Sequence, residues 1–424
     1  DALRSRGMIP GIWIAPLATD PGTPLARAHP GWLIRDDQER PIVGRWDKHI
    51  FCFASGYRDE FIAACKRLID AGIRYFKWDG IDKHLCSSPG HGHGSLRQSA
   101  DERRAMQGYA MPLLIADAMR QLREYCPEVV VEMDVTEPGR SVGLAVLSEG
   151  KYFWMNNGAG AYGDPPTRHG KSTRFIPSLY HPYIPASLQT YACYPHNDPV
   201  HAAQRYNVNS ALIAGWGFWG NLTTLTAGDI ERIGEVVALA RQTLPSVAAR
   251  IPEVAGDVGG SPEIYVMVDD RSATGQIIGF SGTALEHRFA RAGVRTDSVL
   301  AILRNAYEIH DDSVIIPFVF PMPESSREAF LVPNHGAGIT ILSSTSWLRT
   351  ARLAGPDTLQ FTPGAPGRHV IGWGSRRGVP LVVAGSEVRT RITKTPGADG
   401  AGEVYLVEIE STQPGSMIVV TRRK

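Results

Sequence analysis

The segment RYFKWDG, residues 74–80, has the pattern of a short β-strand that ends at a carboxylate. Side chains alternate along a strand, so Lys77 and Asp79 share one face while Trp78 points the other way. The segment follows residues 57–72, in which apolar side chains recur at helical spacing up to Gly72. A helix followed directly by a strand is the repeating unit of α/β folds.

The alternation of strand and helix continues to about residue 250, with further helices predicted at 110–126 and 228–244. Such alternation implies a parallel sheet covered by helices. Polar residues at the C-terminal ends of the strands favour a (β/α)8 TIM-type barrel over an open sheet. The six predicted strands cover residues 11–16, 75–79, 129–134, 152–157, 188–193 and 211–219.

A complete barrel of this type has eight strands. We therefore expect the barrel domain, residues 1–255, to be N-terminally truncated in this chain and to lack its first strands. From residue 260 to residue 424, short alternating runs are separated by Gly, Pro, Asn and Asp turns. This pattern predicts a C-terminal all-β sandwich region. A helix-like stretch at 297–307 interrupts the runs.

The charge balance of the chain argues against some classes of partner. Lys plus Arg is 44 and Asp plus Glu is 43, so the net charge is +1. Neither nucleic acid nor an anionic membrane is expected as a partner at this balance. No apolar run is long enough for a membrane span. The 5 cysteines include no CxxC pair, which argues against a disulfide scaffold and a zinc ribbon.

Catalytic groups of a barrel lie at the C-terminal ends of its strands. The strand at 75–79 ends in Lys77 and Asp79, and an ammonium beside a carboxylate favours its ionised form, as a nucleophile requires. From the spacing alone, a structural ion pair at the barrel mouth fits equally well.

The next two predicted strands also carry polar side chains. Glu132 and Asp134 share a face and precede Arg140; they either bind substrate hydroxyls or are locked to Lys77 and Arg140 as scaffold. The following strand ends in Asn156 and Asn157, amides that suit sugar hydroxyls and equally suit a turn.

A loop with the sequence HLCSSPGHGHG contains His84, Cys86, His91 and His93. These residue types are metal ligands, but their spacing matches no common zinc pattern. The sequence therefore favours a Gly/His loop without metal, and no organic cofactor is expected because no phosphate-binding or dinucleotide motif occurs.

Three segments in order resemble the α-galactosidase (melibiase) family of retaining glycoside hydrolases and its close relatives. They are GMIPGIWIAP at 7–16, PLARAHPGWLI at 24–34 and GIRYFKWDG at 72–80. The resemblance implies that Asp79 is the nucleophile on the fourth barrel strand, that Lys77 contacts substrate and that Trp13 lies near the sugar. It also implies a double displacement by two carboxylates about 5–5.5 Å apart, without metal or cofactor.

The chain departs from the family pattern at the acid/base. The resemblance places this carboxylic acid just after the sixth strand, where the chain has Asn156 and Asn157, and an amide cannot donate the proton. Asp164, later in the same loop, is the nearest carboxylic acid and is our prediction for the acid/base.

The sequence therefore predicts a retaining α-glycosidase, similar to α-galactosidases, that removes terminal α-linked sugars from oligosaccharides or other α-glycosides. One alternative is a catalytically degenerate barrel that binds carbohydrate. Another is a different barrel enzyme of sugar metabolism that uses Lys77. A homo-oligomer is compatible with all three, and the sequence indicates no compartment.

Overall fold

The computed structural model divides into two compact units. Unit 1 is Asp1–Ala161 with Leu188–Ala192, and unit 2 is Tyr162–Ser187 with Cys193–Lys424. The predicted domain division between 1–255 and 260–424 stays a prediction. The structure describes residues 2–135, 139–140, 143–154, 171, 174, 180, 182–193, 202–218, 222–295, 298–310, 312–335, 339–355, 358–365, 367–375, 380–384, 388–395, 403–411 and 418–422.

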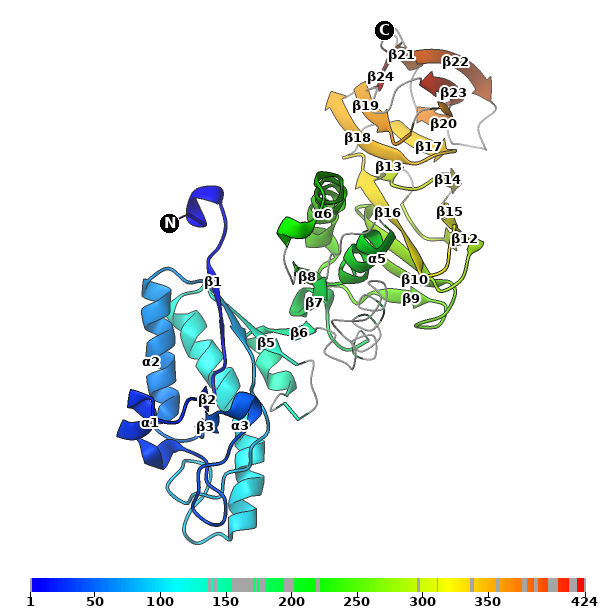
Figure 1. The fold of residues 1–424 in the computed structure, drawn as a ribbon. Coiled ribbons are helices and arrows are strands. Elements are labelled where there is room, and N and C mark those ends of the chain that lie inside the picture. Colours follow the sequence, from blue (N-terminus) through cyan, green and yellow to red (C-terminus); the bar gives the residue numbers. More distant parts are fainter. Residues whose placement is uncertain are drawn as a thin grey trace. The chain divides into compact units, whose positions relative to one another are not determined.

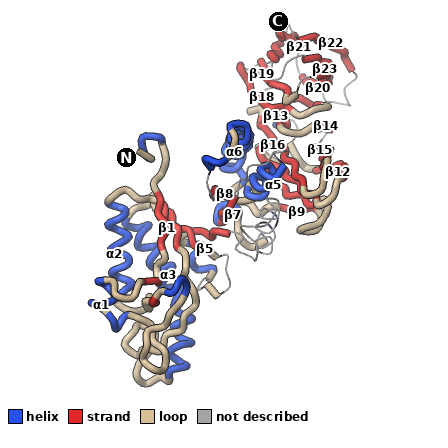
Figure 2. The backbone as a smooth tube through the Cα atoms, in the orientation of Figure 1, coloured by secondary structure: helices blue, strands red, loops and turns tan. Residues whose placement is uncertain are grey.

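Unit 1 contains a curled parallel sheet with the strand order β1-β4-β5-β6-β7 (Figure 1). Each neighbouring pair is parallel, which confirms the predicted barrel-type arrangement of these strands. The helices α2 and α3 lie beside the strands (Figure 2). The elements are β1 (Gly11–Ile14), α2 (Tyr57–Asp70), β4 (Tyr75–Trp78), α3 (Ala100–Tyr125), β5 (Val130–Asp134), β6 (Lys151–Trp154) and β7 (Gln189–Cys193).

Strand β4 shows the alternation that the sequence predicts. Trp78 is fully buried and makes an edge contact with Phe61 of α2, with ring centroids 5.3 Å apart. Lys77 pairs in register with Trp13 of β1 and Glu132 of β5. The apolar side of β4 therefore faces the helix, and its polar side shares a face with polar residues of neighbouring strands.

Long connections follow two of these strands at their C-terminal ends. The connection from β1 to α2 contains a small antiparallel pair and several short helices. The connection from β4 to α3 covers residues 79–99 and ends at Ser99, which caps α3 together with Glu102. The short elements of unit 1 are η1 (Arg4–Arg6), β2 (Ala18–Thr19), α1 (Pro24–Ala28), η2 (Pro30–Trp32), η3 (Arg45–Asp47), β3 (His49–Ile50) and η4 (Leu144–Ser148).

Unit 2 begins with further βα elements. These are η5 (Ala186–Leu188), α5 (Ala202–Ala211), β8 (Gly215–Phe218), η6 (Leu222–Thr224) and α6 (Ala227–Val247). The strand predicted at 211–219 is shorter in the structure, because α5 continues to Ala211.

Three antiparallel sheets follow, in agreement with the predicted β-sandwich region. The first has the order β13 (Val299–Leu303), β16 (Ser325–Pro333), β11 (Thr274–Ser281), β10 (Glu263–Asp269) and β9 (Glu253–Ala255). The second has the order β12 (Leu285–Arg291), β15 (Ser313–Phe320), β14 (Tyr307–His310), β17 (Ile339–Ser344), β20 (Gly367–Ser375), β23 (Glu403–Ser411) and β22 (Val388–Thr395). The third has the order β18 (Leu348–Gly355), β19 (Thr358–Pro363), β24 (Ile418–Arg422) and β21 (Pro380–Ala384).

The helix predicted at 297–307 is wrong. Residues Val299–Leu303 form β13, whose five side chains are all buried and which pairs with β16. A short apolar run does not distinguish a buried helix from a strand with two covered faces, so periodicity alone misassigned it. Within the described ranges, no helix combines the length and apolar character that a membrane crossing requires.

Candidate active site

Asp79 follows the last residue of β4, and its carboxylate receives hydrogen bonds from three segments of unit 1. The indole N–H of Trp13 donates to Oδ2 at 3.1 Å. Arg140 donates to Oδ1 from Nη2 at 2.8 Å, and the backbone N–H of Gly80 donates to the same oxygen at 2.6 Å. The side chain of Asp79 keeps 14% of its surface exposed. These donors therefore orient a carboxylate that a ligand can still reach.

Arg140 is shared between two carboxylates. Its Nη1 donates to Asp82 at 3.0 Å, while its Nη2 contacts Asp79. Asp82 in turn accepts from Nε of Arg45 at 2.9 Å. This chain of charge-assisted hydrogen bonds links three segments at the end of β4 and holds Arg140 in one orientation. The sequence analysis missed the roles of Asp82 and Arg45, since neither lies on a predicted strand.

Two tryptophans lie next to this carboxylate. Trp13 and Trp46 meet edge to face, with ring centroids 5.6 Å apart, and they are 47% and 45% exposed. Gly80 has a φ of +64°, and a Cβ there would approach the ring of Trp46 to 2.7 Å, so only glycine fits. Exposed aromatic faces beside a polar group suit ligands with apolar and polar sides, such as sugars. Trp13 was predicted from sequence and Trp46 was not.

Lys77 donates to Asp134 at 3.0 Å, and the side chains of both are largely buried. Its ammonium also lies 4.2 Å from the ring centroid of Phe153. One predicted contact, between Lys77 and Asp134, is therefore present, while the role of Asp134 in substrate binding stays a prediction. Among the described contacts, Asp79 pairs with Arg140, and Lys77 pairs with Asp134 on β5.

Glu132 belongs to a second set of buried polar side chains on the same face of the sheet. Its carboxylate is 3.7 Å from the ammonium of Lys151, and its side chain is 4% exposed. Burial raises the pKa of Tyr75, and the negative charge of Glu132 raises it further. Glu132 and Asp134 thus both have partners inside the sheet, which favours the scaffold interpretation. Asn156, Asn157 and Asp164 lie outside the described residues, so their roles stay predictions.

A separate cluster lies in the connections after β1 and β4. Ligand atoms of Cys52, Cys86, His91 and His93 all lie within 4.8 Å of one another, and all four residues are buried. Three of these residues belong to the Gly/His loop that the sequence analysis considered. The fourth, Cys52, comes from a distant part of the chain, which is why local spacing did not indicate a cluster.

A model of the melibiase family matches residues 1–249. No curated protein sequence matches the chain.

Several solved α-galactosidase structures share the fold. One is the GH36 α-galactosidase AgaA from Geobacillus stearothermophilus in complex with raffinose, with a TM-score of 0.59 and 17% identity over 78% of this chain and 45% of that one. Another is the α-galactosidase from Lactobacillus brevis, with a TM-score of 0.58 and 16% identity over 78% and 45%. The chain thus spans about half the length of these structures. With more than half of its residues matched by the family model, the chain belongs to the melibiase family.

Proposed function

We propose that this chain is the catalytic part of a retaining α-glycosidase of α-galactosidase type, with Asp79 as the nucleophile. The observation that carries the proposal is the placement of Asp79 at the C-terminal end of β4, oriented by Trp13, Gly80 and Arg140 yet partly exposed. Barrel enzymes carry their catalytic groups at this end of the sheet.

In the proposed reaction, an oxygen of Asp79 attacks the anomeric carbon while the bond to the leaving-group oxygen breaks. A carboxylic acid protonates that oxygen, and a glycosyl ester forms on Asp79. The residue that gave the proton, now a carboxylate, takes a proton from water. The water oxygen attacks the anomeric carbon and releases Asp79. Trp13, Gly80 and Arg140 serve to keep the attacking carboxylate in position.

Asp164 remains our proposal for the acid/base. It is supported by elimination, because Asp134 accepts a hydrogen bond from Lys77 and Glu132 lies beside Lys151. A carboxylate engaged by an ammonium is a poor proton donor. If Asp164→Ala slows substrates with poor leaving groups far more than activated aryl substrates, the assignment is supported. The same signature from Asp134→Ala would move the role to β5.

The proposed substrates are oligosaccharides with a terminal α-linked sugar. Of the structural neighbours, AgaA is described in complexes with raffinose and with stachyose. Two half-exposed tryptophans beside Asp79 suit a neutral sugar of this kind.

The nucleophile is tested by chemical rescue in the full chain. Asp79→Gly should lose hydrolysis of an aryl α-galactoside, and added azide should restore turnover with formation of a β-galactosyl azide. The matched control is Asp59→Asn, which changes a largely exposed carboxylate on α2 and should keep normal rates. Near-normal hydrolysis by Asp79→Gly would rule out the nucleophile role.

Two further measurements distinguish the proposed glycosidase from the two alternative functions. A degenerate carbohydrate-binding barrel would bind raffinose without hydrolysing any aryl α-glycoside. A sugar-metabolism enzyme that forms a Schiff base on Lys77 would be trapped by borohydride. The hydrogen bond from Lys77 to buried Asp134 argues against that alternative, since a Schiff base requires a neutral, accessible amine.

A further inference from the structure

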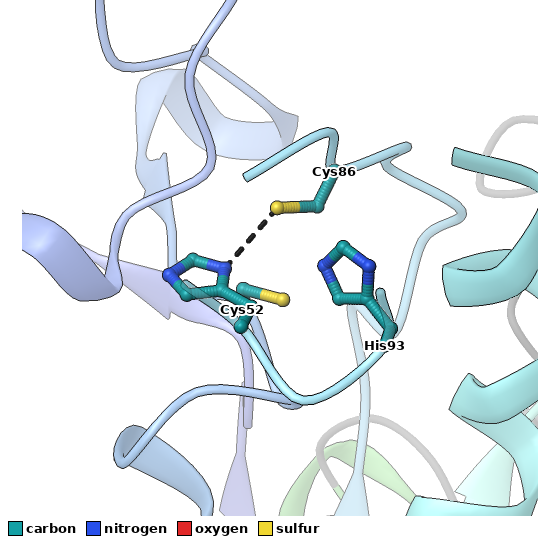
Figure 3. Close-up of side chains that lie close together, drawn as sticks. Cys52, Cys86 and His93 are labelled. Atoms are coloured by element: carbon teal, nitrogen blue, oxygen red, sulfur yellow. Dashed lines mark hydrogen bonds between the residues drawn. The ribbon is translucent and has the colours of Figure 1, made fainter. Parts of the chain in front are cut away.

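The cluster of Cys52, Cys86, His91 and His93 has the composition and closeness of a metal site. The four ligand atoms lie within 4.8 Å of one another, and both cysteines are fully buried (Figure 3). A tetrahedral zinc ion with bonds of about 2.3 Å to sulfur and about 2.0–2.1 Å to nitrogen holds its ligand atoms about 3.3–3.8 Å apart. Side-chain shifts of about 1 Å would therefore complete such a site.

His91 is oriented as a metal ligand would be. Its Nε2 lies 2.7 Å from the carbonyl oxygen of Gly31, and its Nδ1 lies 3.2 Å from Sγ of Cys86, along the dashed line in Figure 3. A carbonyl accepts only, so Nε2 carries the proton and the lone pair of Nδ1 points toward the cluster. A backbone carbonyl that fixes the tautomer in this way is the usual outer partner of a metal-bound histidine.

His93 provides an independent indication. Its side chain is buried with 4% exposure, and neither ring nitrogen has a hydrogen bond of normal geometry to a described residue. In Figure 3 its ring lies beside the thiols of Cys52 and Cys86. Buried polar atoms normally have partners, since leaving them without one costs about 1–3 kcal/mol. A metal ion in the cluster would supply the missing partner.

We propose that these four residues bind a structural zinc ion. Two thiolates and two imidazoles in a tetrahedral arrangement are typical of Zn²⁺. With four protein ligands and a buried setting, no position remains open for substrate, so the ion would support the fold rather than react. Binding would release the two thiol protons to solvent.

The site joins two connections of unit 1. Cys52 follows β3 in the connection from β1 to α2, and the other three ligands lie in the connection from β4 to α3. A backbone hydrogen bond of 2.8 Å from Gly92 to Ala54 already links the same two segments. Because the second connection begins at Asp79, the ion would anchor the loop that leads away from the candidate nucleophile. This inference does not depend on Asp79 being the nucleophile.

Metal analysis of the full chain, purified without chelators from zinc-supplemented cells, tests the proposal. We expect about one equivalent of zinc per chain, and removal by a chelator should lower the Tm by about 5 °C or more. Cobalt substitution should produce the visible absorption of a tetrahedral thiolate site. Absence of bound zinc, or a Cys52–Cys86 disulfide found by mass spectrometry of the alkylated, unreduced protein, would overturn the proposal.

Variants identify the ligands. His93→Ala should lose the zinc, whereas His93→Cys, which still offers a ligand, should retain it. Two controls should retain a full equivalent: His84→Ala, in the same loop but outside the cluster, and Cys65→Ala, a buried thiol on α2. Full zinc in His93→Ala would refute the ligand set. Should His93→Ala fail to fold, the retention of zinc by His93→Cys and His84→Ala still decides the matter, since loss in either contradicts the proposal.

Discussion

Two carboxylate–guanidinium ion pairs in this molecule, Glu263–Arg174 and Asp79–Arg140, are similar in their hydrogen bonds and differ in their exposure to solvent. In unit 2, Glu263 accepts hydrogen bonds from Arg174 at 2.9 and 3.2 Å and from the N–H of Gly259 at 2.8 Å, and both charged side chains are 1–2% exposed. In unit 1, Asp79 also has three donors but keeps 14% of its surface open. The two carboxylates therefore have a similar number of hydrogen-bond donors, but only that of Asp79 is accessible from solvent.

The difference shows why a buried charge pair is a weak sign of function. Burial alone would raise the pKa of Glu263, but the positive charge of Arg174 and hydrogen bonds from Arg174 and Tyr265 lower it overall. All of these partners are protein groups, and no surface remains for a ligand. At Asp79 three donors orient a carboxylate that stays partly exposed, and half-exposed tryptophans flank it. We therefore expect substitutions at the two groups to separate activity from stability.

The largest effect is expected from Asp79→Asn. The amide keeps the size of the side chain but cannot form the glycosyl ester, so kcat/KM on an aryl α-galactoside should fall by about 10³-fold or more. The Tm should stay close to that of the unchanged chain, because the site is partly open. A large loss of stability with residual activity would place Asp79 in the same structural class as Glu263.

Glu263→Gln should show the opposite behaviour. Removing one partner of a buried ion pair leaves the Arg174 charge uncompensated and should cost about 3–5 kcal/mol of unfolding free energy. The measurement is denaturation followed separately in unit 2, by hydrogen exchange and mass spectrometry of peptides from that unit. An unchanged midpoint would show that the Arg174–Glu263 pair does not support the fold.

The pH dependence of stability is a second test of the contribution of Glu263. Its folded-state pKa lies below the ordinary value of 4.5, so its stabilising contribution is present above about pH 4.5 and is lost as the pH falls through the folded-state pKa. The unfolding free energy of the unchanged chain should therefore decline more steeply below pH 4.5 than that of Glu263→Gln. Parallel declines would assign the acid sensitivity to other carboxylates.

Arg140→Lys should have an intermediate effect on activity. Lysine keeps the positive charge but cannot bridge Asp79 and Asp82 with a planar fork. We expect kcat to fall about 10-fold to 100-fold, because Asp79, the proposed nucleophile, loses its fixed orientation. Asp82→Asn should produce a smaller loss in the same direction, and normal kcat in both variants would show that the network does not position Asp79.

The smallest effect is expected from Trp46→Ala. Loss of an aromatic face beside the proposed sugar site should weaken binding by about 1 kcal/mol, which raises KM about fivefold. The kcat value should change less, since Trp46 has no contact with the attacking oxygen among the described hydrogen bonds. A drop in kcat without a change in KM would instead assign Trp46 to the support of Gly80.

The sequence was sufficient to predict the strands of the parallel sheet of unit 1 and the two faces of β4, whereas the short strands β2 and β3 were not predicted. Alternation along RYFKWDG predicts that Trp78 points away from the face of Lys77 and Asp79, and in the structure Trp78 contacts Phe61 of α2 and Asp79 follows the strand end. The partners of these side chains were not predictable in the same way. Lys77 turns to Asp134 on the adjacent strand, which depends on the register between strands rather than on spacing within one.

Residues contributed by the connections were the hardest to predict. Trp46 and Arg45 come from a short helical turn with no apolar periodicity, and Cys52 lies 34 positions before Cys86. Only the folded path of the chain brings Trp46 and Arg45 to the end of β4 and Cys52 to Cys86, so no local pattern indicated them. For the same reason, the sequence analysis favoured a Gly/His loop without metal.

The ion network around Asp79 has a consequence for the order of proton transfers. Asp79, Asp82, Arg45 and Arg140 carry two negative and two positive charges, so the network is neutral before reaction. Formation of the glycosyl ester would remove the charge of Asp79 and leave a net charge of +1 at the same position. A neighbouring carboxylic acid that has just released its proton would then be stabilised as a carboxylate, ready to accept a proton from water. The two guanidinium groups would in this way set the direction in which the acid/base changes role.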